Sequence, residues 1–359
     1  MRILCLVPYP EGEAPGQRLK FEQQYATWRA AGHTVDCRPF FTPDFYAILY
    51  KPVSTLLKIR RTLGALMRRW AELWDARNYD VVFIFLYVAP VGPPIYEWVL
   101  HHIIKTPVVY DLDDANFLPN ASAANPLAAW VKWPSKIKSI IPWAKEVIVV
   151  THHLGDFARS LNPNVTYIPP TINTDAYVTK VHRPSGEKIV IGWSGSHSTS
   201  PYLKLLTPVL QRLAQRDDVR FKVIGDAHFS IPGVPVEAIA WKEETEVAEL
   251  SEFDIGLYPV PHDPWVLGKG GLKALQYMGM GIPAVCTPYG ACLGFIQDGV
   301  HGFFADTEDE WYDILVRLIE NPELRQQIGT TARKLVEESF SVKAQGPVYL
   351  GILEKAAHG

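Results

Sequence analysis

Cysteine is scarce in this sequence, and its few positions exclude two classes of site. Four cysteines occur among 359 residues, at positions 5, 37, 286 and 292. They form no CxxC pair, and they are too sparse for a disulfide framework. Cys5 and Cys37 fall in apolar, strand-like runs where a buried thiol is the expected state. We therefore predict reduced thiols in a cytosolic protein, with no cysteine-based metal site.

Long uninterrupted apolar runs are also lacking. The run after Arg2 stops at Pro8, so no signal peptide is expected. The longest apolar stretch, residues 81–100, contains three prolines, a glycine and Glu97. These interruptions fit a buried strand, a loop and a helix start better than a membrane span.

Basic charge is not in excess either. The formal net charge is −3, which argues against a dedicated nucleic-acid-binding protein. Residues 1–180 hold 19 basic and 15 acidic side chains, whereas the remainder holds 16 and 23. Together with a length comfortable for two domains, this asymmetry fits two domains with different partners.

Short β-rich runs alternate with segments of helical spacing along the chain. The predicted strands are 3–7, 33–40, 80–86, 106–110, 146–150, 165–168, 188–193, 220–224, 254–258 and 282–286. The predicted helices are 17–31, 52–76, 95–104, 152–161, 202–215, 243–251, 269–280, 308–321 and 323–338. Most strands are nearly continuous apolar runs, as in parallel sheets covered on both faces. The alternation predicts doubly wound parallel sheets.

A proline-containing stretch from Pro169 to Gly186 interrupts the alternation and is predicted as a linker. The prediction is an α/β protein of two Rossmann-like domains, 1–183 and 187–342, facing across a cleft. A C-terminal helix over 343–359 is expected to pack back on the first domain. Ligands of such sheets bind beyond the carboxyl ends of the strands.

A glycine-rich turn before the helix predicted at 269–280 is the strongest motif. Gly268, Gly270 and Gly271 leave backbone N–H groups free at a helix start, where the helix dipole favours an anion. Lys269 and Lys273 stand one turn apart and put two ammonium groups on one face. The turn predicts a pyrophosphate site, although an ordinary glycine turn with two solvated lysines has the same spacing.

The residues that follow resemble the nucleotide-sugar site of the family-4 retaining glycosyltransferases, within glycosyl transferases group 1, which have the GT-B fold. The similarity lies in KALQYM at 273–278 and GIPAV at 281–285. It extends in order through RILCLVPYP near the amino terminus, GHTV at 32–35, IGWSGS at 191–196, FDIGL at 253–257 and DGVHGF at 298–303. The resemblance therefore covers nearly the whole chain.

This resemblance implies transfer of a hexose from an NDP-sugar to a hydroxyl acceptor, with retention of anomeric configuration and no metal or other cofactor. Members commonly carry two glutamates eight positions apart, where this chain has Gly268 and Gln276. The second glutamate holds the ribose hydroxyls, which the amide of Gln276 can also do. The first contacts the donor sugar and diphosphate region, and Asp263 is a candidate substitute.

A second turn of the same kind follows the strand predicted at 188–193. It comprises Ser194, Gly195, Ser196, His197 and Ser198. Its amides and hydroxyls suit phosphate binding, with a plain polar loop as the alternative. An arginine common in the family is replaced here by Ser196, which leaves Lys269 and Lys273 as the implied partners of the diphosphate. By resemblance Asp226 and Trp241 lie near the base pocket, and Trp241 fits a core position equally well.

In the first domain, Gly16, Gln17 and Arg18 lie between the first strand and the first helix. Gly16 permits close backbone approach, and by resemblance this loop lies under the sugar and diphosphate. A helix-capping turn is the alternative. His152 and His153 follow a later strand and are candidates for the acceptor side, or for a structural role at a helix start.

Asp111, Asp113 and Asp114 form an acidic cluster at the end of a predicted strand. A Mg²⁺ or Mn²⁺ site is one interpretation, and a phosphatase nucleophile motif without its downstream context is another. We favour a third, in which the carboxyl groups line the cleft and bind sugar or acceptor hydroxyls without a metal. Capping of the next helix is the structural alternative.

Two segments of the first domain are basic and free of acidic residues. Residues 51–70 carry Lys51, Lys58, Arg60, Arg61, Arg68 and Arg69 with apolar residues at helical spacing. Residues 126–145 add three tryptophans and four lysines. Such segments can lie on anionic lipid, or their apolar stripe can pack on the sheet. We expect a glycan or lipid-linked acceptor and a protein peripheral on the cytoplasmic face of a membrane.

Two other functions remain open from the sequence. A sugar-nucleotide epimerase of the same fold would need catalytic carboxylates and histidines in the cleft. A non-catalytic protein that binds sugar nucleotides or glycans is compatible with the missing glutamates. Binding of nucleic acid is not expected from the charge.

Overall fold

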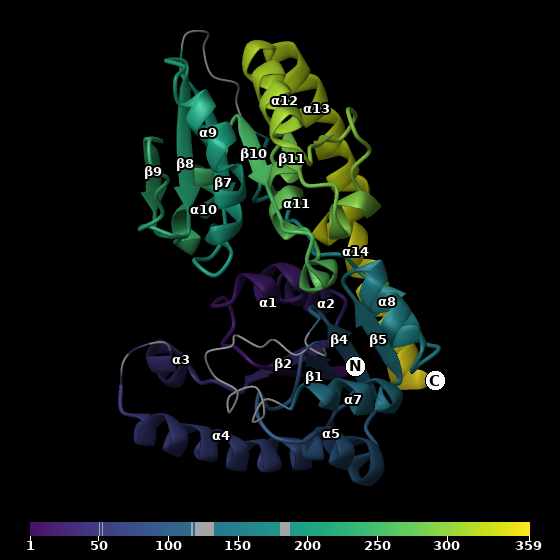
Figure 1. Cartoon of the computed structure of the whole chain (residues 1–359). Helices are drawn as coiled ribbons and strands as arrows, with labels where there is room; N and C mark the ends of the chain where they lie inside the picture. Colours follow the sequence, from purple (N-terminus) through teal and green to yellow (C-terminus); the bar gives the residue numbers. More distant parts are fainter. Residues whose placement is uncertain (50, 52, 116–117, 119–132, 180–186) are drawn as a thin grey trace. The chain divides into compact units, whose positions relative to one another are not determined.

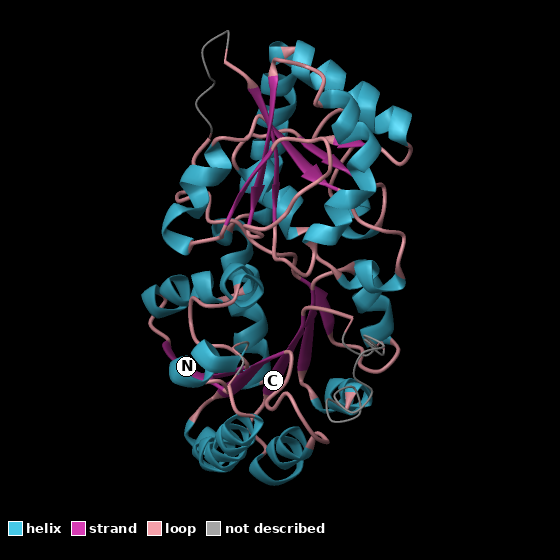
Figure 2. Cartoon of the chain, turned by 60° about the vertical axis from the view of Figure 1, so that its left-hand side comes forward, coloured by secondary structure: helices cyan, strands magenta, loops and turns pink. Residues whose placement is uncertain are grey.

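The computed structural model describes residues 1–49, 51, 53–115, 118, 133–179 and 187–359, which form two compact units (Figures 1 and 2). The first unit comprises Met1–Pro170, Gly268–Gly270 and Gln345–Gly359. The second comprises Thr171–Leu267 and Gly271–Ala344. The first unit thus ends at Pro170, whereas the sequence placed the boundary at 183.

Thr171 to Tyr177 are counted with the second unit because polar contacts tie them to it. Ile172 forms a parallel bridge with Ser341, and an Arg333 NH group donates to the Thr174 carbonyl at 2.7 Å. The later part of the predicted linker, residues 180–186, lies outside the described residues.

The first unit is built on a six-stranded parallel sheet of order β2-β1-β3-β4-β5-β6. The strands are β1 (Arg2–Val7), β2 (Thr34–Pro39), β3 (Val81–Phe85), β4 (Val108–Leu112), β5 (Glu146–Val149) and β6 (Val165–Tyr167). All six were predicted, but β4 extends two residues further than expected and takes Asp111 into the sheet. The strand order reverses beside β1, as in a doubly wound sheet.

Among the described residues, the helices of the first unit follow the predicted alternation with two additions, α3 and α7. They are α1 (Pro15–Lys20), η1 (Glu22–Gln24), α2 (Tyr25–Ala30), α3 (Pro43–Leu49), α4 (Thr55–Asp75), η2 (Ala76–Asn78), α5 (Ile95–Val99), η3 (Leu100–Ile104), η4 (Pro134–Lys136), α7 (Ile137–Trp143), α8 (His152–Arg159) and most of α14 (Val342–His358). The helix predicted over 17–31 is broken at Phe21, whose φ of −138° is not helical.

A parallel sheet of six strands also organises the second unit, in the order β12-β11-β10-β7-β8-β9. Its strands are β7 (Ile189–Ser194), β8 (Val219–Ile224), β9 (Val236–Ile239), β10 (Ile255–Tyr258), β11 (Ala284–Cys286) and β12 (Phe303–Phe304). The edge strands β9 and β12 were not predicted, because four and two residues give too little pattern to detect. The two-unit α/β fold itself is confirmed.

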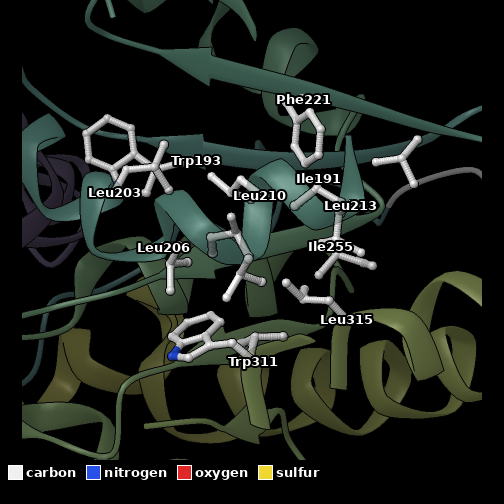
Figure 3. Close-up of a cluster of buried hydrophobic side chains, with 14 of the residues drawn as sticks. Ile191, Trp193, Leu203, Leu206, Leu210, Leu213, Phe221, Ile255, Trp311 and Leu315 are labelled. Carbon is white, nitrogen blue, oxygen red and sulfur yellow. The ribbon is translucent and has the colours of Figure 1, made fainter. Parts of the chain in front are cut away.

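Helices join the strands of the second unit in the expected alternation. They are η5 (Ser200–Leu206), α9 (Thr207–Leu213), η6 (Glu243–Thr245), α10 (Glu246–Ser251), η7 (Pro264–Gly268), α11 (Leu272–Gly279), η8 (Gly290–Gly294), α12 (Glu308–Glu320), α13 (Pro322–Leu335) and η9 (Val336–Phe340). Figure 3 shows the core that they enclose, where Leu206 and Leu210 meet Ile191 of β7 and Trp311 of α12.

The core of the first unit depends on residues from both ends of the chain. Trp28 of α2 and Tyr349 of α14 are fully buried, and their ring centroids lie 6.0 Å apart. Across the described residues, no helix is long and apolar enough to cross a membrane.

Candidate functional site

The turn after β7 in the second unit exposes a row of backbone amides. β7 ends at Ser194. In the turn that follows, Ser196, His197 and Ser198 are all exposed. Within the described residues, their N–H groups form no hydrogen bond. The Ser196 carbonyl accepts from the Thr199 N–H at 2.9 Å, which closes the turn. Exposed amides of this kind form a ready site for an anion.

Lys273 of α11 lies across this turn. A Cβ on Gly195 would stand 2.4 Å from the Lys273 Cε, so only glycine lets the lysine pass this close. The Lys273 Nζ lies 3.5 Å from the Thr199 Oγ1 and 5.4 Å from the centroid of the Trp193 ring. The structure therefore brings together Lys273 and the 194–198 turn, two motifs that lie far apart in the sequence.

A second glycine turn, after β8, supports the first. Gly225 has a φ of +108°, and a Cβ there would stand 1.8 Å from the Gly195 carbonyl oxygen. Asp226 accepts a hydrogen bond from the Ser200 hydroxyl at 2.5 Å and another from the His228 N–H at 3.3 Å. Asp226 thus links the two loops.

Gln276 points into the second unit. It is 4% exposed, and its amide NH₂ donates to the Tyr177 hydroxyl and to the Glu246 Oε1, both at 3.1 Å. The Tyr177 hydroxyl donates in turn to the Glu246 Oε2 at 2.9 Å. Gln276 can donate to a ribose hydroxyl only after this network opens. Tyr177 and Glu246 were not predicted, because they are 99 and 30 residues away from Gln276.

Two further candidates in the second unit have local roles. The exposed Asp263 accepts from the Trp265 N–H at 2.8 Å and so caps the short helix η7. Trp241 is half-buried just beyond β9.

Lys269 does not share a helix face with Lys273, which corrects the predicted spacing. α11 begins at Leu272 because Gly271 adopts a left-handed φ of +74°. Lys269 and its neighbours Gly268 and Gly270 belong to the first unit, where the Lys269 Nζ is 4.0 Å from the Asp114 Oδ2. A Cβ on Gly268 would stand 2.6 Å from the Ala115 nitrogen, so a glutamate does not fit there without a shift.

The loop after β1 in the first unit is held by a buried amide. Gln17 is 1% exposed. Its side-chain NH₂ donates to the Tyr9 carbonyl at 2.8 Å and to the Glu22 carboxylate at 2.5 Å. This network gives Gln17 a structural role in shaping the loop. Arg18 is half-buried. Gly16 is exposed, and a Cβ on it would stand 3.6 Å from the Asp113 Oδ2.

Asp111 is fully buried and belongs to the core. Its carboxylate lies 3.7 Å from the Lys20 Nζ and accepts from the Tyr349 hydroxyl at 3.4 Å. Burial raises the pKa of Asp111 to about 6, while Lys20 and Tyr349 lower it. Its burial rules out the predicted contact with a substrate, because β4 carries it into the sheet.

Asp113 and Asp114 are half-buried just beyond the end of β4. Burial raises the pKa of Asp113 well above its usual range, against the effect of Lys20. Burial also raises the pKa of Asp114, and Lys269 opposes that rise. Across the part of the chain that the structure describes, no three His, Cys, Asp or Glu side chains are grouped to hold a metal ion.

His152 and His153 open α8 and are both exposed. The His152 ring stacks on Tyr167 with centroids 4.5 Å apart. The helix is capped by Thr151, whose hydroxyl accepts from the Leu154 N–H at 3.1 Å. No described contact links either histidine to Asp113 or Asp114.

Comparison with known proteins gives a family match within the second unit. Residues 188–321 match Glycosyl transferases group 1. No curated protein matches the chain. The matched region contains β7, the turn that follows it and Lys273.

Solved glycosyltransferase structures share the fold of the whole chain. Sucrose-phosphate synthase from Thermosynechococcus elongatus is 14% identical, with a TM-score of 0.70 over 99% of this chain and 98% of that one. A glycosyltransferase from Rickettsia africae is also 14% identical, with a TM-score of 0.70 over 100% and 99%. HepE of Anabaena, solved with UDP-glucose, is 16% identical, with a TM-score of 0.69 over 99% of both chains. The chain therefore has the GT-B fold, as its resemblance implied.

Proposed function

We propose that this protein is a glycosyltransferase that moves a hexose from an NDP-sugar to a hydroxyl of a glycan or lipid-linked acceptor, with retention and without a metal. The observation that carries the proposal is Lys273 lying over Gly195, beside the exposed amides of Ser196 to Ser198. A cation and several free N–H groups at the end of a parallel strand suit a diphosphate.

Stabilisation of the leaving group is the main task of this site. Breaking the bond between sugar and diphosphate builds negative charge on the diphosphate oxygens. Lys273 and the amides of the 194–198 turn would stabilise that charge without moving, because the turn is already closed by Thr199. Ser196 and Ser198, whose hydroxyl oxygens are 2.7 Å apart, add further donors.

Recognition of hydroxyl groups falls to the first unit in this proposal. Asp113 and Asp114 lie at the carboxyl end of β4, where burial raises the pKa of both side chains. A carboxyl group accepts hydrogen bonds from sugar hydroxyls, and in its protonated form it also donates one. Gly16 leaves room beside Asp113 for a ring to approach.

The comparisons support an NDP-sugar donor. The region that holds Lys273 matches Glycosyl transferases group 1, and HepE of Anabaena, of the same fold, has been solved with UDP-glucose. We propose that Asp226 and Trp241 lie near the nucleoside, and that Asp263 and Lys269 act near the sugar. We also propose that the enzyme acts at an anionic membrane surface on the cytoplasmic side.

One experiment separates this proposal from its two rivals. Purified protein is incubated with a panel of NDP-sugars, and the products are resolved by chromatography. Slow release of NDP supports a transferase, formation of a new NDP-sugar supports an epimerase, and no change with measurable binding supports a non-catalytic protein. Lys273→Ala on the same panel shows whether any release comes from this site.

The panel also tests metal dependence. We expect NDP release to survive EDTA, because Lys273 and the amides supply the positive charge that a metal would bring. Complete loss in EDTA that Mn²⁺ restores would instead assign a cation to Asp113 and Asp114. The anomeric configuration of the transferred sugar, read by NMR, tests retention.

A further inference from the structure

The longest helix of the first unit, α4, presents its large apolar side chains to solvent. This apolar stripe consists of Leu56, Ile59, Leu63, Met67, Trp70 and Trp74, at successive turns of one helix face. Met67 is 75% exposed and Trp74 is 62% exposed. A helix that covers a soluble core buries such a stripe. The structure thus excludes packing of the stripe on the sheet.

The opposite face of α4 is attached to the unit through small and polar groups. Its buried residues are Ala65, Arg69, Glu72 and Leu73. The guanidinium of Arg69 is fully buried and donates to the carbonyls of Val7, Arg38 and Val88 at 2.8–2.9 Å. This anchoring holds the apolar stripe outward. Arg69 therefore supports the helix and cannot face an external ligand.

A pocket of about 480 Å³ lies beside the stripe, with walls from the α3 region and α4. Arg60, Arg61 and Arg68 line it together with Thr42, Phe45 and Leu57. Arg68 is already bound to Glu72 at 3.0 Å and to the Phe40 carbonyl at 2.7 Å. Within the described residues, Arg60 and Arg61 form no ion pair. The pocket therefore offers two guanidinium groups without an ion-pair partner among the described residues, together with the apolar side chains of Phe45 and Leu57.

Other exposed apolar residues stand on the neighbouring helix. α5 packs beside α4 (Figure 1), and the Tyr96 hydroxyl donates to the Leu66 carbonyl at 2.9 Å. Ile95 and Trp98 of α5 are 48% and 43% exposed. Trp133 of the second basic segment is also exposed, whereas Trp130 and Lys132 lie outside the described residues.

We propose that α4 lies in the headgroup layer of an anionic membrane, with its stripe among the acyl chains and a lipid phosphate in the pocket at Arg60 and Arg61. An apolar face flanked by arginine is the pattern of interfacial helices. Guanidinium groups bind phosphate oxygens by paired hydrogen bonds. The membrane would be the partner of the proposed glycosyltransferase. The proposed function supplies only the reason for membrane binding, and the surface of α4 is the evidence for it.

Other occupants fit the surface less well. A free phosphate would fill the pocket but would leave six large apolar side chains in water. A second copy of this chain would cover the stripe but would bring the same uncompensated arginines together. A phospholipid satisfies both parts of the surface, because its phosphate and its acyl chains belong to one molecule.

Vesicle flotation tests the inference. The probes are vesicles of phosphatidylcholine, with and without phosphatidylglycerol, and binding is measured against lipid concentration. We expect binding only to the anionic vesicles. Arg60→Gln with Arg61→Gln should weaken it about thirtyfold, from about 1 kcal/mol for each basic residue near the membrane. Leu63→Gln with Met67→Gln should weaken it about tenfold and should reduce quenching of tryptophan fluorescence by brominated lipid.

A matched control has the same change in charge. Arg159→Gln with Arg212→Gln removes two exposed arginines that form surface ion pairs elsewhere, and it should bind as the parent does. No binding by the parent, or equal loss in the control, would overturn the inference. A dimer that the Leu63→Gln, Met67→Gln variant dissociates would overturn it as well, in favour of a second copy. Circular dichroism checks folding, and NDP release without vesicles tests the proposed function separately.

Discussion

The two units carry the same parallel sheet but differ in what stands beyond its first strand. After β7 in the second unit, Lys273 lies over an exposed, amide-rich turn. After β1 in the first unit, the loop is shaped by Gln17, and the nearby groups are the carboxyls of Asp113 and Asp114. One scaffold thus presents a cation at one site and carboxyl groups at the other.

This difference shows how two sheets of the same fold can present different chemical groups. A parallel sheet fixes where a ligand can sit, but the side chains after each strand decide its charge. Positive charge and free N–H groups suit a diphosphate, whereas carboxyl groups suit sugar hydroxyls. The following variants test that division, beginning with the largest expected effect.

Asp111→Asn tests whether Asp111 serves the core of the first unit. Its pKa of about 6 lies above the ordinary 3.8, so the folded state holds the proton more tightly. Its stabilising contribution is therefore complete below pH 3.8 and lost as the pH rises through 6. Between pH 4 and 8 the free energy of unfolding of the parent should fall by about 3 kcal/mol relative to that of Asp111→Asn. This follows from about 1.36 kcal/mol for each unit of pKa shift. Denaturation at several pH values measures this difference.

The control for that variant is Asp175→Asn, an exposed carboxylate paired with Lys343 in the second unit. It should follow the parent within about 1 kcal/mol across the same range, as exposed pairs contribute little. A difference between parent and Asp111→Asn that does not change with pH would show that the Asp111 carboxyl titrates normally.

Lys273→Ala tests the cation of the second unit. Loss of a charge-assisted contact should weaken binding of UDP or GDP by about 1.5–3 kcal/mol, or roughly ten- to a hundredfold. Titration calorimetry measures the affinity directly. Lys204→Ala, another lysine of the same unit in η5, is the control and should leave the affinity unchanged. Equal affinities in Lys273→Ala and the parent would remove the diphosphate from this turn.

Gly195→Ala tests the close approach of Lys273 to the turn. The added Cβ would stand 2.4 Å from the Lys273 Cε and 2.6 Å from the Trp193 ring, so one of them must move. Overpacking of this kind costs about 1–3 kcal/mol. We expect weaker nucleotide binding together with a lower thermal midpoint. Unchanged values of both would show that the lysine side chain has room to pass elsewhere.

Lys269→Ala should have the smallest effect of the four. Its ion pair with Asp114, at 4.0 Å, is long and partly exposed, and such pairs contribute about 0–1 kcal/mol. Nucleotide affinity should fall less than about fivefold. A loss as large as that of Lys273→Ala would restore the sequence-based prediction that both lysines hold the diphosphate.

Most of the fold could be predicted because its signals are local. Val81–Phe85 is a continuous apolar run and became β3, and the alternation of such runs with helices predicted two parallel sheets. β12 has two residues and no pattern of its own, so only its pairing with β11 defines it. The start of α11 depends on the left-handed Gly271, which spacing does not reveal.

The candidate site was predictable only where the motif and its partners are adjacent in sequence. Each turn could be recognised, but the approach of Lys273 to Gly195 comes from the packing of α11 on the sheet. Asp111 looked like part of an acidic cluster because its partner Tyr349 lies 238 residues away. The orientation of Gln276 could not be predicted either, because its partners Tyr177 and Glu246 are also distant in the sequence.

The contribution of α14 to the first unit has a consequence for how the chain is made. Tyr349, Ile352, Leu353 and Ala356 complete a core whose other buried members lie before residue 170. A ribosome adds about 5–20 residues per second, so Trp28 waits roughly 15–65 s for Tyr349 to be synthesised. During that interval the second unit can fold from a continuous stretch of chain. The amino-terminal unit, although synthesised first, is therefore the last to be completed, and a truncation of the final fifteen residues would damage the beginning of the protein.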